Sequence, residues 1–195
     1  MWNEPLGEYQ VLVLPRDRYP EPRPLPEGFS FINEVPRSVE RELLGPEFTH
    51  WQIPYERRFP GAREDSLLAV AKGELIVGIS YLGADNRIGL SNYGEAHYMV
   101  TRPEFRGLGL TFPRFTRRLE RATSWGLAGL VMVSNREGIP ELYERWGALR
   151  VGTLKPVSRA SRIILGRFVS PDRRMARRAA AVLREHGAST PSSEP

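Results

Sequence analysis

The stretch RPEFRGLGLT, residues 102–111, follows a run typical of a β-strand and precedes one typical of a helix. Its glycines, Gly107 and Gly109, permit backbone conformations that bring several N–H groups close to one ligand. The start of the helix adds unpaired N–H groups and the positive end of the helix dipole. This turn therefore predicts a phosphate-bearing ligand.

The runs around this turn predict a sheet with helices. Residues 66–83 form two strand-like runs broken at Lys72-Gly73, which indicates a hairpin, and residues 94–103 form a third strand that Pro103 ends. A helix is expected from about residue 109 to residue 125, because its apolar side chains recur on one stripe. Four arginines lie off that stripe and are expected mostly on a solvated face: Arg114, Arg117, Arg118 and Arg121.

The flanking segments predict further elements. Downstream, strands are expected at 129–134, 148–154 and 161–168, with a short helix near 138–145. Upstream, a short strand over 9–14 precedes a connector with five prolines at 15–28, then a strand at 29–35 and a helix at 36–44. Residues 46–65 are aromatic and irregular, and either line a pocket or pack beneath a long loop. Ser170 and Pro171 would begin a last helix over 171–187.

The composition restricts the class of protein. A chain of 195 residues, 41% hydrophobic, is long enough for one sizeable domain. The absence of cysteine excludes disulfides, thiolate zinc sites and cysteine nucleophiles. Its three histidines, His50, His97 and His186, lie far apart, so no metal is expected. Without a signal-like start or an apolar run of roughly 18 residues, a cytoplasmic location and no membrane partner are expected.

Two later features add to the glycine turn. The strand VMVS ends at Asn135, and the helix after it contains LYERWGA, residues 142–148. With the turn, these features resemble the GNAT superfamily of acyl-CoA dependent N-acyltransferases over residues 66–168. Arg106, Gly107 and Gly109 match the pyrophosphate loop of that family, whereas Thr111 stands where Gly or Ala is usual.

The resemblance implies an α/β fold, with a mixed, mostly antiparallel sheet, splayed central strands, helices on both faces and an extra C-terminal helix. Residues 1–170 would form a single domain, in which 1–65 shape the acceptor side and 66–168 form the acyl-CoA core. Residues 171–187 would be a basic helix and 188–195 a disordered tail. The splay is expected between strands 94–102 and 129–134.

The resemblance also implies a co-substrate, acetyl-CoA or another acyl-CoA, and its binding residues. The pyrophosphate would be bound by the loop formed by Arg106, Gly107, Leu108, Gly109, Leu110 and Thr111. The pantetheine arm would pair like an added strand with Met99, Val100 and Thr101, and Asn135 would bond it as well. Asn135 serves equally well as a turn former before the next helix.

Acyl transfer to an amine needs a base, and the departing thiolate needs a proton. Glu95 falls where some family members place a carboxylate base, and strand alternation would put Glu95, His97, Met99 and Thr101 on one face. Glu95 directly, or Glu95 and His97 through a water, would take the proton. Tyr143 resembles the family tyrosine that protonates the coenzyme A sulfur. The structural alternatives are a solvated Glu95, a structural His97 and a Tyr143 that only packs in the core.

Direct transfer of the acyl group to a primary amine of a small molecule or peptide is the predicted activity. A non-catalytic acyl-CoA binding or regulatory module on the same fold is the alternative. Nucleic acid is not expected as a partner, because the arginine-rich helix lacks the aromatic residues that accompany single-strand binding. A homodimer and the identity of the acceptor stay open.

Overall fold

One sheet of seven strands forms the centre of the molecule. The computed structural model describes residues 8–44, 61, 63–154 and 173–188. Within these residues the strand order is β2-β3-β4-β5-β6-β1-β7, and every neighbouring pair is antiparallel except β5 and β6. The strands are β1 (Tyr9–Pro15), β2 (Phe29–Ile32), β3 (Leu67–Lys72), β4 (Leu75–Gly83), β5 (Tyr93–Thr101), β6 (Gly129–Ser134) and β7 (Leu149–Leu154). This confirms the mixed, mostly antiparallel sheet.

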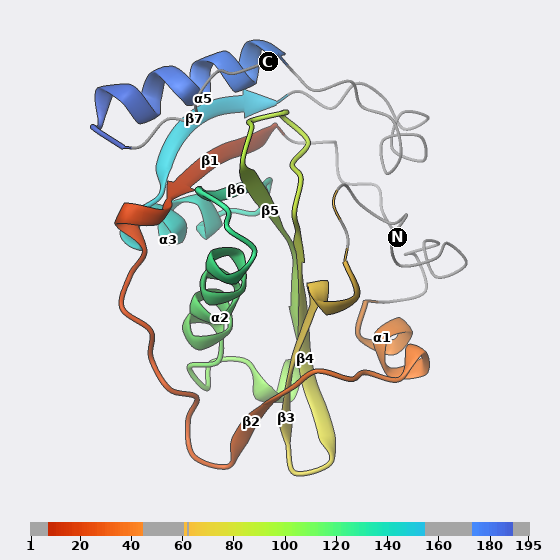
Figure 1. The fold of residues 1–195 in the computed structure, drawn as a ribbon. Coiled ribbons are helices and arrows are strands. Elements are labelled where there is room, and N and C mark those ends of the chain that lie inside the picture. The colour runs from red at the N-terminus through yellow and green to blue at the C-terminus, as the bar shows by residue number, and fades with distance from the viewer. Residues whose placement is uncertain (1–7, 45–60, 62, 155–172, 189–195) are drawn as a thin grey trace.

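Helices cover both faces of the sheet, as expected. The α-helices of the described residues are α1 (Arg37–Leu44), α2 (Thr111–Ser124), α3 (Ile139–Arg145) and α5 (Arg173–Glu185). Helices α2 and α3 pack on one face, where their side chains join a core cluster with Leu12, Leu130 and Met132. Helices α1 and α5 lie on the opposite face, α5 beside β7 and α1 beside β4 (Figure 1). Short 3₁₀ turns occupy Arg16–Arg18, Glu64–Ser66 and Pro103–Phe105.

The N-terminal strand is part of the central core. β1 lies between β6 and β7, antiparallel to both, so it joins the middle of the sheet to its edge. Its side chains alternate as a two-sided buried strand requires: Leu12 and Leu14 face α2 and α3, whereas Val11 and Val13 face α5. All four side chains are fully buried.

The two central strands, β5 and β6, form the only parallel pair of the described sheet, and they diverge part of the way along their length. β5 and β6 pair from Tyr93 opposite Gly129 to Ala96 opposite Met132. Beyond that point the pairing stops, although β5 continues to Thr101 and β6 to Ser134. The predicted splay is therefore confirmed, and its apex lies at Ala96 and Met132.

A β-bulge at Tyr98 reverses the alternation of β5. Met99 pairs with Ser80 and His97 with Tyr81, so Tyr98 is the extra residue, and its φ is +29°. The expectation that Glu95, His97, Met99 and Thr101 share one face is therefore wrong. Glu95 and His97 follow Tyr93 on the α1 and α5 face, whereas Met99 packs toward α2 and Thr101 accepts a hydrogen bond from a side chain of α2.

Most predicted elements agree with the structure to within two residues. The hairpin, the strand before the glycine turn and the helix after it all appear at the expected places. The predicted strand at 161–168, the cap at Ser170 and Pro171, the aromatic residues of 46–60 and the tail after residue 188 lie outside the described residues. No helix in the described part of the chain has the length and apolar character needed to span a bilayer.

Candidate active site

The glycine corner between β5 and α2 is open to solvent. Gly107 and Gly109 have φ values of +77° and +78°, which only glycine adopts without strain, and both residues are exposed. Among the residues that the structure describes, none accepts a hydrogen bond from the amides of Gly109 to Phe112. The first turn of α2 carries no acidic side chain. The corner can therefore offer several N–H donors and the positive end of a helix dipole to an anion.

The strand leading to this corner contributes the predicted pantetheine residues. Met99 packs toward α2, Val100 packs on the α1 face, and the Thr101 hydroxyl accepts a hydrogen bond of 2.6 Å from Arg114. Arg106 is exposed and donates to the Thr101 carbonyl over 3.3 Å, which holds the corner against the end of β5. Asn135 is exposed directly after β6. The glycine corner lies at the end of β5, and Asn135 lies at the end of β6.

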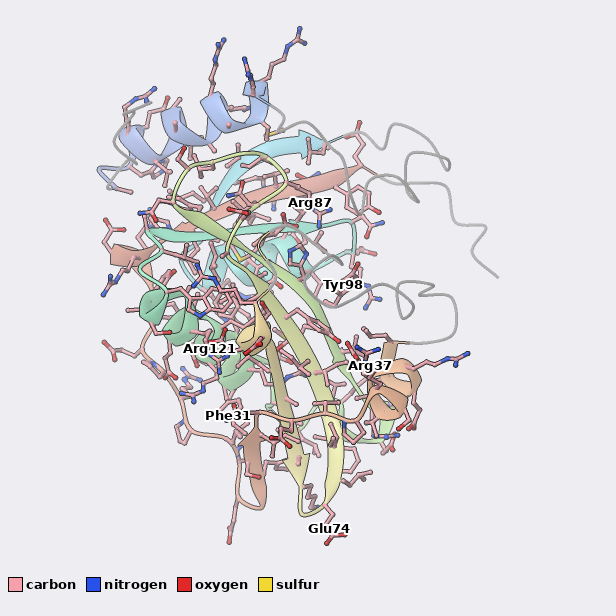
Figure 2. The ribbon with its side chains drawn as sticks, turned by 45° about the vertical axis from the view of Figure 1, so that its right-hand side comes forward. Phe31, Arg37, Glu74, Arg87, Tyr98 and Arg121 are labelled. Carbon is pink, nitrogen blue, oxygen red and sulfur yellow. The ribbon has the colours of Figure 1, made fainter. Side chains whose placement is uncertain are left out.

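Glu95 is a fully buried carboxylate bound to an arginine. Its oxygens accept hydrogen bonds from the Arg87 backbone amide, over 2.8 Å, and from the Arg87 guanidinium, over 2.5 Å at Nε. Burial opposes the charge of Glu95, but the contacts with Arg87 outweigh that effect and hold the pKa of the carboxyl below its usual value. Arg87 lies in the loop after β4, on the side of the sheet that also carries Tyr98 (Figure 2).

His97 lies beside this ion pair. Its Nδ1 is 3.5 Å from a Glu95 oxygen, and its side chain is almost completely buried. Burial is the main reason that the pKa of His97 falls to about 4, and the nearby Arg87 and Arg118 charges act in the same direction. His97 is therefore neutral at pH 7, so its ring can accept a proton.

The buried His97 predicts a pH dependence of folding. Its folded pKa of about 4 lies below the unfolded value of about 6.5, so the unfolded chain binds the proton first. The free energy of unfolding should therefore fall as pH drops from about 6.5 to 4, at about 1.4 kcal/mol per pH unit and about 3 kcal/mol in total. Urea unfolding of the wild type and His97→Gln at several pH values measures this. Parallel pH curves for the two proteins would contradict the assignment.

Tyr143 lies on α3 in an aromatic cluster. Its ring is 5.5 Å from that of Phe115 and 5.8 Å from that of Trp146, measured between centroids. The residue is half-buried on the α2 and α3 face of the sheet. Its hydroxyl interacts with Arg118 of α2 and favours the charged form of that guanidinium. Tyr143 therefore combines core packing with a polar contact.

Two of the α2 arginines are not on a solvated face. Arg114 and Arg118 are each 1% exposed, which corrects the expectation from the helical pattern. They lie one turn apart, next to the apolar stripe of Phe115 and Leu119, and face the sheet with it. Arg117 pairs on the surface with Glu120. Arg121, which Figure 2 labels, pairs with Asp65. Burial lowers the pKa of Arg114 to about 9, so it stays charged at pH 7.

Arg114 is held mainly by backbone oxygens. Its Nη2 donates to the carbonyls of Ile79 and Val100, and Gly78 leaves the space that the guanidinium occupies. A Cβ atom at Gly78 would lie 2.8 Å from Arg114 Nη1. Arg114 therefore fixes the end of β5, where the glycine corner begins.

Sequence reasoning missed Arg87 and the burial of Arg114 and Arg118. Nothing in the loop around Arg87 distinguishes it from the other arginines of the chain. For Arg114 and Arg118, the available signal was their i, i+4 spacing next to the apolar stripe. No cluster of three or more possible metal ligands occurs within the described ranges.

Comparison with solved structures identifies the fold. A GCN5-related N-acetyltransferase from Sphaerobacter thermophilus matches 77% of this chain at 18% identity with a TM-score of 0.51. A tandem GNAT protein from the clavulanic acid biosynthesis pathway matches 77% of this chain at 12% identity with a TM-score of 0.56. A GCN5-related N-acetyltransferase from Kribbella flavida matches 76% of this chain at 14% identity with a TM-score of 0.53.

This chain covers only 50%, 52% and 56% of those three structures. No protein-family model matches the sequence, and no curated protein is a significant match. The likeness therefore lies in the fold, where the splayed strands and the helix after the glycine turn agree with the resemblance drawn from the sequence. The chain has the fold of the GCN5-related N-acetyltransferases.

Proposed function

We propose that the protein is an acyl-CoA dependent N-acyltransferase that transfers the acyl group, most simply acetyl from acetyl-CoA, directly to a primary amine. The observation that carries this proposal is the exposed glycine corner at the start of α2, whose amides have no acceptor among the described residues. The amides of residues 107–111 would bind the pyrophosphate, and the end of β5 and Asn135 would bind the pantetheine arm.

The splay separates two groups with complementary chemistry. His97 lies on the α1 and α5 face of the sheet, whereas Tyr143 lies on the α2 and α3 face. Both lie near the apex of the splay: His97 directly follows the last paired residue of β5, and Tyr143 interacts with the arginine that contacts the His97 carbonyl. A thioester placed in that opening would meet a proton acceptor from one side and a hydroxyl donor from the other.

In the proposed acyl transfer, His97 and Tyr143 each have one role. The amine nitrogen forms a bond to the acyl carbon and loses its proton to the neutral His97 ring, while the carbon–sulfur bond breaks. Tyr143 gives its hydroxyl proton to the departing thiolate. Glu95 is already occupied by Arg87, so we assign it the positioning of His97 rather than the removal of the proton. A covalent acyl-cysteine intermediate is excluded because the chain has no cysteine.

The second candidate is a module that binds acyl-CoA without catalysis. The observation that favours it is the Glu95–Arg87 ion pair, which removes the predicted carboxylate base from the reaction. The two candidates are separated by thiol release from acetyl-CoA over a panel of amines, together with calorimetry of coenzyme A binding. Binding without thiol release favours the module, and the absence of binding contradicts both.

Changing the glycine corner should weaken cofactor binding. Gly109→Ala adds a Cβ to a residue at φ +78°, so the loop must change its backbone conformation or accept strain of about 1 kcal/mol. Because the bound anion depends on the direction of the amides, we expect the dissociation constant of coenzyme A to rise about 10- to 100-fold. Isothermal calorimetry measures it.

Gly126→Ala is the matched control. Gly126 has φ +74°, follows the other end of α2, and has nothing within 4 Å of the position that a Cβ would take. The variant should lose comparable stability and bind coenzyme A like the wild type. Equal affinities for the two variants would show that the corner does not bind the cofactor.

A further inference from the structure

Arg118 is a buried cation at the splay. Its side chain is 1% exposed, and its Nη1 lies 3.5 Å from the carbonyl of His97, the first residue of β5 beyond the last pair with β6. The ring of Phe115 lies 5.7 Å from the guanidinium carbon, and the Tyr143 hydroxyl interacts with the guanidinium from α3. The charge of Arg118 therefore lies beside β5, next to the residue at which its pairing with β6 has ended.

One edge of this guanidinium lacks an acceptor among the residues that the structure describes. Within the described residues, no oxygen meets hydrogen-bond geometry at Nε or Nη2 of Arg118. The Tyr143 hydroxyl approaches the same guanidinium and favours its charged form. Nε and Nη2 form the side-on edge of an arginine, which matches the two oxygens of a carboxylate. An unsatisfied donor pair at full burial is costly, so a ligand that accepts from both donors is favoured.

A second buried cation, Arg114, makes the binding of a negatively charged ligand near Arg118 more favourable. Arg114 lies one turn away on α2, and the charge of Arg118 lowers the pKa of Arg114. In the part of the chain that the structure describes, neither arginine forms an ion pair with Asp or Glu, although Arg87, Arg102 and Arg150 do. Two buried guanidiniums without an ion-pair partner in the described residues favour an anion that is present in the bound substrate, not one that appears only while the thiolate leaves.

We propose that the side-on edge of Arg118, backed by Arg114, binds a carboxylate of one substrate. This inference rests on the proposed acyl transfer and names its substrate class. The carboxylate belongs either to the acyl group, as in a dicarboxylic monothioester such as succinyl-CoA, or to the amine acceptor, as in an amino acid. Both sources present the same planar pair of oxygens to the guanidinium.

The test compares matched substrates on matched variants. Succinyl-CoA is compared with butyryl-CoA, and an α-amino acid with its amide, using the full chain as wild type, Arg118→Met and Arg117→Met. Arg117 is the control because its side chain is 42% exposed and pairs with Glu120 on the surface of the same helix. Arg118→Met should lower kcat/KM for the carboxylated substrate about 10- to 100-fold relative to its neutral partner. Arg117→Met should not change that ratio.

The substrate pair that loses its preference identifies the source of the carboxylate. If only the preference for succinyl-CoA over butyryl-CoA is lost, the carboxylate belongs to the acyl donor. If only the preference for the amino acid over its amide is lost, the carboxylate belongs to the amine acceptor. The proposal is overturned if the wild type shows no preference within either pair. It is overturned equally if Arg118→Met slows all substrates by one factor, because Arg118 would then act on the thiolate alone.

A binding measurement separates this inference from the proposed function. If no donor is turned over, saturable binding of succinate that Arg118→Met removes still supports the site, and equal binding by both proteins overturns it. If Arg118→Met does not fold, Arg118→Lys keeps the charge but lacks the side-on edge, because an ammonium is a point donor. Arg118→Lys should then lose the carboxylate preference, and its retention would overturn the proposal.

Discussion

Replacing His97 by glutamine is expected to lower kcat for acyl transfer about 100- to 10,000-fold, the range found for removal of a positioned general base. The physical reason is that the ring is neutral at pH 7 and has a nitrogen lone pair for the amine proton. Burial, which lowers its pKa to about 4, keeps the ring neutral but also makes it a weaker base, so the loss should lie toward the lower end of this range. Glutamine retains a polar side chain of similar reach but cannot take a proton at pH 7. Steady-state kinetics with saturating amine measures the loss, and calorimetry should find the coenzyme A dissociation constant within about threefold of the wild type.

The control for this substitution is His186→Gln. His186 is exposed at the end of α5, where a ring nitrogen lies 2.9 Å from the Val182 carbonyl, away from the splay. The His186→Gln variant should have the same kcat as the wild type. An unchanged kcat in His97→Gln as well would remove His97 from the chemistry and leave its burial as a purely structural feature.

Replacing Arg87 by methionine is expected to cost about 3–5 kcal/mol of folding stability at pH 7, because it leaves the charge of Glu95 buried without its main partner. Glu95 has a side-chain exposure of 0%, so water cannot replace the lost contacts. His97, at 3.5 Å, offsets only part of the loss. Urea unfolding of the variant and the wild type gives the difference directly.

The reciprocal substitution and the pH dependence test this assignment. Glu95→Gln should cost less than Arg87→Met, because the Arg87 side chain is 42% exposed and can turn to solvent. In the wild type the pKa of Glu95 is lowered, so the stability from the pair is present at neutral pH and is lost as pH falls through the folded pKa. In Arg87→Met, burial should raise the pKa of Glu95 instead. The difference in free energy of unfolding between the wild type and Arg87→Met should therefore shrink between pH 7 and pH 4. A constant difference would contradict the assignment of a buried, charged Glu95.

Local patterns predicted the elements because they depend on neighbouring residues. Pro103 ends a strand wherever it lies, and the glycines of residues 107–109 permit positive φ values without tertiary help. The splayed sheet that the structure shows was predicted from the resemblance to the GNAT superfamily, not from these local patterns alone. The place of β1 between β6 and β7 was not predictable, because strand neighbours far apart in the sequence are chosen by the fit of the whole core.

By itself, the sequence determined that a helix begins after a glycine corner, since turn chemistry and helix start are properties of adjacent residues. Only the tertiary structure decided which side chains meet at the splay. One extra residue at Tyr98 turned Met99 away from His97, and Arg87 took the carboxylate of Glu95. Packing against the sheet buried Arg118, whose charge a helical pattern alone places in water. Burial, register and charge pairing depend on contacts between distant segments, and those exist only in the folded chain.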